Sequence, residues 1–162
     1  MERTVRLKAL YHHSLGEATT MKDFTKARNI ILSALDCARL RDLIITARQF
    51  SSTPSVLLDT LEGELNRATI LPPEEIPPYV VTMNTCVRLI DISTGKTMTY
   101  TLVFPNDEDL QQGKLSILSD MGVAIIGFSV GSTVEWHFPE GLRSIRIDMI
   151  YFQPEATKQY EM

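Results

Sequence analysis

The spacing of hydrophobic residues changes at a proline-rich segment, and this change constrains the fold more than any other feature of the sequence. Before the segment, apolar residues recur every three or four positions, as in amphipathic helices; after it they alternate with polar residues, as in strands. Because proline fixes φ and lacks an N–H, the segment itself favours neither a helix nor a central strand. The sequence therefore predicts an α+β fold, whose helical and sheet parts are joined by a linker at 70–78. The linker holds four of the eight prolines: Pro72, Pro73, Pro77 and Pro78.

The helical part, residues 29–69, is predicted to be an antiparallel two-helix hairpin. Ser33 and Asp36 stand where side chains satisfy free amide groups at a helix start. We expect helices from about Ala34 to Gln49 and from about Pro54 to Ala68, since proline suits the first turn of a helix. Matched apolar stripes predict a short coiled coil that either projects or folds back on the rest of the chain. These stripes are Leu40, Leu43, Ala47 and Phe50 in the first helix and Leu58, Leu61, Leu65 and Ala68 in the second.

The sheet part, residues 79–153, is predicted to be a hairpin-rich antiparallel sheet with one short helix. Alternation in the last strand places Ile145, Ile147, Met149 and Tyr151 on its buried face. Trp136 lies in the middle of a strand, and we expect it in the core. The short helix, Gly122 to Gly127, is expected to cover the sheet. The expected strands are Tyr79 to Met83, Cys86 to Ile92, Thr97 to Phe104, Leu115 to Leu118, Thr133 to Phe138 and Arg143 to Phe152.

The two ends of the chain and its charge indicate what kind of partner it has. Residues 1–28 are predicted to be a tail or adaptable segment, and 154–162 a C-terminal tail. Residues 1–67 carry 10 basic and 8 acidic side chains, a net charge of +2, whereas 68–162 carry 6 and 12, a net charge of −6. Such an acidic part would repel nucleic acid, so direct DNA contact is at most weak and secondary. A protein with a basic surface is the better partner.

No residue pattern in the sequence predicts an enzyme, a cofactor or a metal site. Cys37 and Cys86 have no paired spacing, and no segment has the pattern of a secretion signal or membrane span, so we expect a cytoplasmic protein outside the membrane. His12 and His13 are adjacent and His137 stands alone, which does not favour a metal centre. An acidic loop at 107–109 leaves a metal-dependent enzyme as the last-ranked alternative.

Three blocks of the sequence resemble one known family. They are "ELNRATILPPEEIPPYVVTMNTCVRLIDISTGKTMTYTLVFP", "GKLSILSDMGVAIIGFSVGSTVEWHFPEG" and "YFQPEA". The resemblance is to the Gre-factor superfamily of bacterial transcription elongation factors, and within it to the Rnk-type members, over roughly residues 30 to 157. It implies an FKBP-like α+β domain that docks on RNA polymerase near the secondary channel, with the hairpin pointing at that channel. The alternative function is that of a stand-alone interaction or chaperone-like module with an unrelated client.

The resemblance also defines the residues expected to bind the partner. Cleavage factors of the superfamily have a longer hairpin whose tip carries an acidic pair that helps to hold catalytic Mg²⁺. Here residues 49–55 contain no carboxylate, which implies docking without stimulation of transcript cleavage. Where the family usually has Ser-Pro or Ala-Pro ahead of the short helix, this chain has Ser119-Asp120. The expected partner surface is Leu118, Ser119, Asp120, Met121 and Gly122, together with the tip residues Phe50, Ser51, Ser52 and Thr53; the alternative is that the first group only caps the helix.

Overall fold

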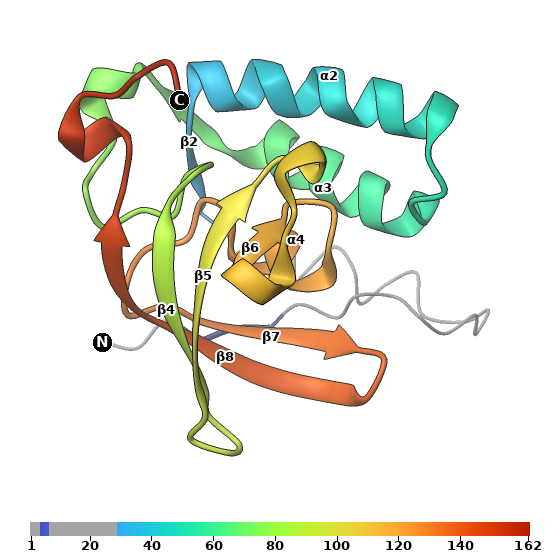
Figure 1. Ribbon diagram of the computed structural model, residues 1–162, viewed down its shortest axis with the longest axis vertical. Helices are drawn as coiled ribbons and strands as arrows, with labels where there is room; N and C mark the ends of the chain where they lie inside the picture. Colours follow the sequence, from blue (N-terminus) through green and yellow to red (C-terminus); the bar gives the residue numbers. More distant parts are fainter. Residues whose placement is uncertain (1–3, 7–28) are drawn as a thin grey trace.

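A six-stranded mixed sheet and a pair of antiparallel helices make up most of the protein (Figure 1). The structure, a computed structural model, describes residues 4–6 and 29–162. The α+β class is confirmed, and the strand order is β1-β7-β8-β4-β5-β6. The strands of this sheet are β1 (Thr4–Arg6), β4 (Cys86–Asp91), β5 (Thr97–Val103), β6 (Lys114–Ser116), β7 (Thr133–Phe138) and β8 (Gly141–Phe152).

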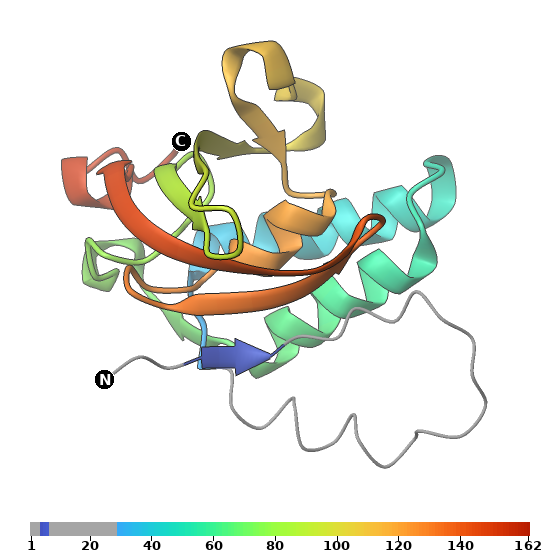
Figure 2. The ribbon, with the colours of Figure 1, turned by 90° about the horizontal axis from the view of Figure 1, so that it is seen from below.

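The sheet departs from the predicted antiparallel pattern at both edges. Strand β1 pairs with β7 in parallel, and β6 pairs with β5 in parallel, while the central pairs are antiparallel. Figure 2 shows β1 alongside the long, curved β7–β8 ribbon. At the β5–β6 edge, the parallel direction is possible because a loop and not a tight hairpin turn joins the two strands. Apart from β1, the tail predicted at 1–28 lies outside the described residues.

Two expectations about individual strands are wrong. Residues 79–83 form no strand, because their backbone groups pair with residues 127–130 and not with a strand of the sheet. Val80 and Ser129 form an isolated bridge, and the Val81 amide donates to the Phe128 carbonyl at 2.9 Å. In β8, two register shifts against β4 change which face the side chains take. After the shift at Leu89 and Arg88, Met149 and Tyr151 are exposed, while Ile145 and Ile147 before it are buried as expected.

The two long helices begin and end close to the predicted residues. Helix α2 spans Ala34–Phe50 and helix α3 spans Ser55–Arg67, with Pro54 directly before α3. The Ser33 hydroxyl accepts a hydrogen bond from the Asp36 amide at 3.0 Å, which confirms the predicted helix cap.

The buried stripe of α2 differs from the predicted one. Its apolar members are Cys37, Leu40, Ile44 and Ala47, whereas Phe50 is 82% exposed. The predicted and the observed stripes share Leu40 and Ala47 and have the same 3-4-3 spacing, so the spacing alone does not decide between Leu43 and Ile44 as the buried neighbour. Phe50, the last residue of α2, projects beyond the packed part. In α3 the apolar stripe is Leu57, Leu58, Leu61 and Leu65, and Ala68 is partly buried against it.

A small parallel sheet closes the base of the helical hairpin. Strand β2 (Ile31–Ser33) enters α2, strand β3 (Thr69–Leu71) leaves α3, and the two pair in parallel. The amide of Ile31 also donates to the carbonyl of Gly127 at 3.1 Å, at the end of the short helix α4 (Asp120–Ile125). Strands β2 and β3 have three residues each, too few for an alternating pattern to predict them.

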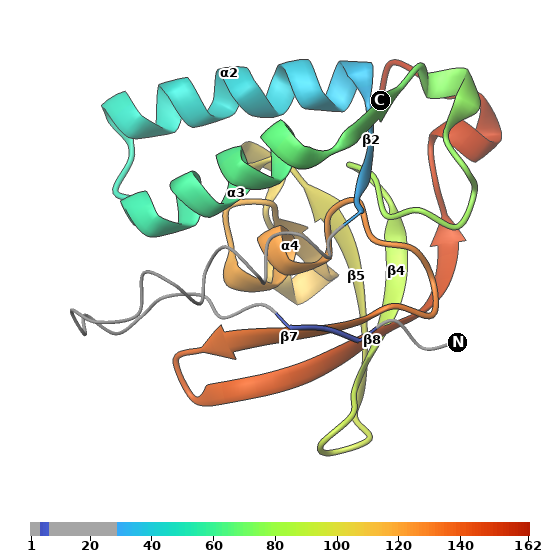
Figure 3. The same ribbon diagram turned by 180° about the vertical axis from the view of Figure 1, so that it is seen from behind.

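The helical hairpin folds back on the sheet and does not project. Its buried leucines belong to the same core as residues of β4, β5 and β8, and Figures 1 and 3 show α4 between the hairpin and the β7–β8 ribbon. Of the two arrangements left open by the sequence, the structure has the second. Among the described residues, no helix combines the length and apolar character needed to cross a membrane.

Candidate functional site

The first candidate surface is the start of α4, where two serine side chains form hydrogen bonds with the backbone. Ser119 accepts a hydrogen bond from the Gly122 amide at 3.0 Å and donates one to the Ser116 carbonyl at 2.6 Å. The Ser116 hydroxyl in turn accepts from the Leu118 amide at 3.0 Å. Both serines therefore satisfy backbone groups that a helix start and its preceding turn would otherwise leave unpaired.

Asp120, the first residue of α4, is bonded to a core side chain. Its carboxylate accepts a hydrogen bond from the indole nitrogen of Trp136 at 3.4 Å, near the upper limit for such a bond. Trp136 itself is 1% exposed, which confirms its expected place in the core. Asp120 is half-buried, so part of its carboxylate is exposed and a basic partner can approach it.

The remaining two residues of this group point inward. Met121 is 8% exposed, and Gly122 is buried against the turn before the helix. A side chain at Gly122 would collide with the Ser116 carbonyl and the Ile117 backbone. The accessible part of the predicted surface is therefore limited to the half-buried residues Leu118, Ser119 and Asp120.

The second candidate surface is the connection between α2 and α3, which is open to solvent. Phe50, Ser51 and Ser52 are exposed, and Thr53 is half-buried. The Ser51 hydroxyl donates to the Ala47 carbonyl at 2.9 Å and bonds the Thr53 hydroxyl at 2.9 Å, so it closes the end of α2. This tip therefore presents one phenyl ring and a set of hydroxyl groups.

Carboxylates near the tip form ion pairs with an arginine of α2. Arg48 pairs with Asp59 at 2.8 Å and with Glu62 at 2.8 Å, and these contacts join α2 to α3. Asp42, the other nearby acid, lies two turns before the end of α2. The two candidate surfaces sit on separate elements, and no hydrogen bond between residues 50–53 and 118–122 occurs within the described chain.

A buried carboxylate at the base of the hairpin links the helical part of the chain to the sheet part, and the sequence analysis did not predict this link. Asp36 is 3% exposed, and its Oδ2 accepts a hydrogen bond from the Met83 amide at 3.0 Å. Burial raises the pKa of Asp36 to about 6, although the Met83 hydrogen bond acts in the opposite direction. The sequence pattern marked Asp36 only as part of a helix cap, because nothing local reveals a distant amide.

The acidic loop does not form a metal centre. Asp109 accepts hydrogen bonds from the amides of Gln111 and Gln112, and so caps a short helical turn. Within residues 4–6 and 29–162, no group of three His, Cys, Asp or Glu side chains is placed to hold a metal ion.

Two family models match different parts of the chain. The model described as "Rnk N-terminus" matches residues 28–71, and the model described as "Transcription elongation factor, GreA/GreB, C-term" matches residues 76–152. The "Regulator of nucleoside diphosphate kinase" of Escherichia coli (strain K12) is 33% identical over 132 residues, which cover 81% of this chain and 95% of that protein. The chain belongs to the Rnk family of GreA/GreB-related proteins.

Other relatives of this Rnk-family chain are elongation factors. The "Transcription elongation factor GreA" of Prosthecochloris aestuarii is 41% identical over 83 residues, covering 50% of this chain and 52% of that protein. A solved structure, "Prokaryotic transcription elongation factor GreA/GreB from Nitrosomonas europaea", has 41% sequence identity and a TM-score of 0.64. It covers 76% of this chain and 100% of that one. The relatives are named as regulators or elongation factors, and none of these names is that of an enzyme.

Proposed function

We propose that this protein binds bacterial RNA polymerase at the mouth of the secondary channel and regulates elongation without stimulating transcript cleavage. Family membership supports the partner and the cytoplasmic location, because the matched relatives are transcription elongation factors and regulators. The FKBP-like character of the sheet domain stays part of this proposal. So does the division of the chain into a hairpin at 29–69, a linker at 70–78 and a docking domain at 79–153.

The observation that carries the absence of cleavage is the composition of the tip. Residues 49–55 offer an aromatic ring, an amide, a proline and hydroxyl groups, but no carboxylate. A hard cation such as Mg²⁺ requires oxygen ligands that compensate its charge, and neutral hydroxyls alone hold it poorly. The acid nearest to the tip, Asp59, is neutralised by Arg48.

The length of the hairpin supports the same conclusion. Helix α2 has 17 residues and α3 has 13, so the arms extend about 26 Å and 20 Å at the helical rise. Much of that length packs against the rest of the molecule, and only the end with Phe50 is free of the core. A hairpin held in this way suits occupation of a channel entrance more than reach into a distant active centre.

The start of α4 is the proposed polymerase-binding surface of the sheet domain. Leu118, Ser119 and Asp120 combine an apolar side chain, a hydroxyl and a negative charge on a segment whose backbone is fixed by hydrogen bonds. A rigid segment loses little conformational entropy on binding, which favours its use as a docking element.

The proposal is tested by binding the full chain to purified core RNA polymerase. We expect saturable binding that weakens several-fold in Asp120→Asn, which keeps an oxygen for Trp136 but removes the charge, and also in Phe50→Ser. Glu140→Gln, at an exposed position in the turn between β7 and β8, is the matched control and should bind like the unchanged protein. Absence of binding by the unchanged protein would refute the proposal and favour the alternative of a module with an unrelated client.

A further inference from the structure

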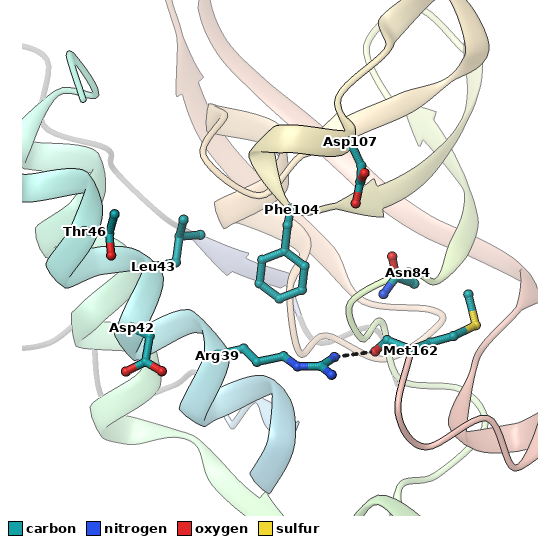
Figure 4. Close-up of a pocket in the computed structure, with 8 residues that line it drawn as sticks. All are labelled: Arg39, Asp42, Leu43, Thr46, Asn84, Phe104, Asp107 and Met162. Atoms are coloured by element: carbon teal, nitrogen blue, oxygen red, sulfur yellow. Dashed lines mark hydrogen bonds between the residues drawn. The ribbon is translucent and has the colours of Figure 1, made fainter. Parts of the chain in front are cut away.

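A groove of about 440 Å³ lies between α2 and the loop that follows β5 (Figure 4). Leu43 forms part of the helical wall and Phe104 part of the opposite wall. Both side chains are half-buried and pack against the core, so they are supported from behind while they line the groove. The groove is distinct from the start of α4, which contributes no lining residue.

The helical wall of the groove extends toward the hairpin tip. Arg39, Leu43 and Thr46 line the groove, and Phe50 follows at the next position of the same spacing. Residues three and four apart lie on one face of a helix, so these four side chains form a continuous stripe. The stripe therefore joins the apolar wall of the groove to the exposed ring of Phe50.

One end of the groove is closed by the C-terminal segment. The Arg39 guanidinium donates to the backbone oxygen of Met162 at 2.6 Å and to the carbonyl of Glu161 at 3.1 Å, as Figure 4 shows for Met162. Met162 also lines the groove. The Arg39 guanidinium is therefore hydrogen-bonded to backbone oxygen atoms at the closed end of the groove.

The open part of the groove is acidic. Asp42 lies on α2 and Asp107 on the opposite wall, and Figure 4 shows them on either side of the Phe104 ring. Both are exposed, and in the described part of the chain neither carboxylate has a hydrogen bond or ion pair. Two unpaired carboxylates beside apolar side chains attract cations and repel phosphate groups, which excludes nucleic acid as the occupant.

We propose that this groove binds a basic amphipathic helix of a partner protein. Apolar side chains of that helix would pack on Leu43 and Phe104, while its lysines or arginines would meet Asp42 and Asp107. This is the helix-in-groove mode of recognition, in which anchors spaced three or four residues apart enter an apolar groove and charges at the rim set the orientation. The surface goes beyond the polymerase-docking residues and does not depend on them.

The test uses two fluorescein-labelled helical peptides of about 16 residues, with leucines at i, i+3, i+4 and i+7. One peptide carries lysines between the leucines and the other carries glutamates. Fluorescence anisotropy with the full chain should show saturable binding of the lysine peptide and none of the glutamate peptide. The double variant Asp42→Lys/Asp107→Lys should weaken lysine-peptide binding at least about tenfold at low salt.

The control is the double variant Glu75→Lys/Glu140→Lys, which changes the net charge equally at two exposed positions outside the groove. It should change the affinity by less than about twofold. Amide NMR shifts on peptide addition should cluster at residues 42–46 and 104–107. No saturable binding, equal weakening in both double variants, or shifts confined to the start of α4 would each overturn the proposal. Polymerase binding through Asp120 would be unaffected by any of these results.

Discussion

At the start of α4 the side chains are held by the fold, whereas at the α2–α3 connection they project into solvent. Ser119 and Asp120 each bond to another element or turn, and Gly122 has no space for a side chain. Phe50, in contrast, is 82% exposed at the end of its helix. Mutations at the start of α4 should therefore affect both stability and partner binding, whereas mutations at the α2–α3 connection should affect binding alone.

The largest expected effect is that of Gly122→Ala. Its methyl group would collide with the Ser116 carbonyl and the Ile117 backbone, so one of these segments must move. We expect a loss of about 3 kcal/mol in the free energy of unfolding, measured by chemical denaturation. Gly63→Ala is the control, because there the methyl group meets only the flexible end of Arg67 and replaces a helical glycine. It should stabilise by about 0.5 kcal/mol or more, and equal losses in both variants would contradict this account.

The next effect concerns the base of the hairpin and depends on pH. Because the folded pKa of Asp36 is raised to about 6, its contribution to stability is present at low pH and is lost as the pH rises through 6. Between pH 5 and pH 7.5 the free energy of unfolding of the unchanged protein should fall by about 1.4 kcal/mol more than that of Asp36→Asn. The exposed Asp42→Asn should show no such difference, and parallel pH profiles for all three proteins would show that the raised pKa is wrong.

A smaller effect is expected at the cap of α4. Ser119→Ala removes the acceptor for the Gly122 amide and the donor to the Ser116 carbonyl, and should cost about 1 kcal/mol in thermal or chemical unfolding. Ser52→Ala, an exposed serine of the tip, is the matched substitution and should change stability by less than about 0.5 kcal/mol. Similar costs at both serines would remove the contrast between the two surfaces.

The smallest effect on stability is expected for Phe50→Ser. The ring buries little surface within the protein, so the free energy of unfolding should change by less than about 0.5 kcal/mol. If the tip contacts the partner, polymerase affinity should nevertheless fall, because exposed aromatic side chains supply much of the energy of protein interfaces. Denaturation and binding measured on the same preparation separate the two effects; a large loss of stability would place the ring in the core.

Elements with strong local signals could be predicted from the sequence. Ser33 and Pro54 marked the starts of the two long helices, and alternation defined β4, β5 and β7 closely. These features act through neighbouring residues, so a single sequence contains them. The carboxylate-free tip belongs to the same class, since its composition can be read directly.

Features that depend on distant contacts could not be predicted in this way. Strands β2 and β3 have three residues each and exist only because they pair with one another. The register shifts of β8 depend on its pairing with β4, and they exposed Met149 and Tyr151 against expectation. At the site, the bond from Trp136 to Asp120 joins residues 16 positions apart, so the inward orientation of this segment appears only in three dimensions.

The most direct test of the central claim is RNA cleavage in a backtracked elongation complex. The account predicts that the full chain binds the complex and leaves the cleavage rate at its intrinsic value, and that it slows cleavage by a competing channel-binding factor. Faster transcript cleavage on addition of this protein alone would contradict the claim that a tip without carboxylates occupies the channel mouth without chemistry.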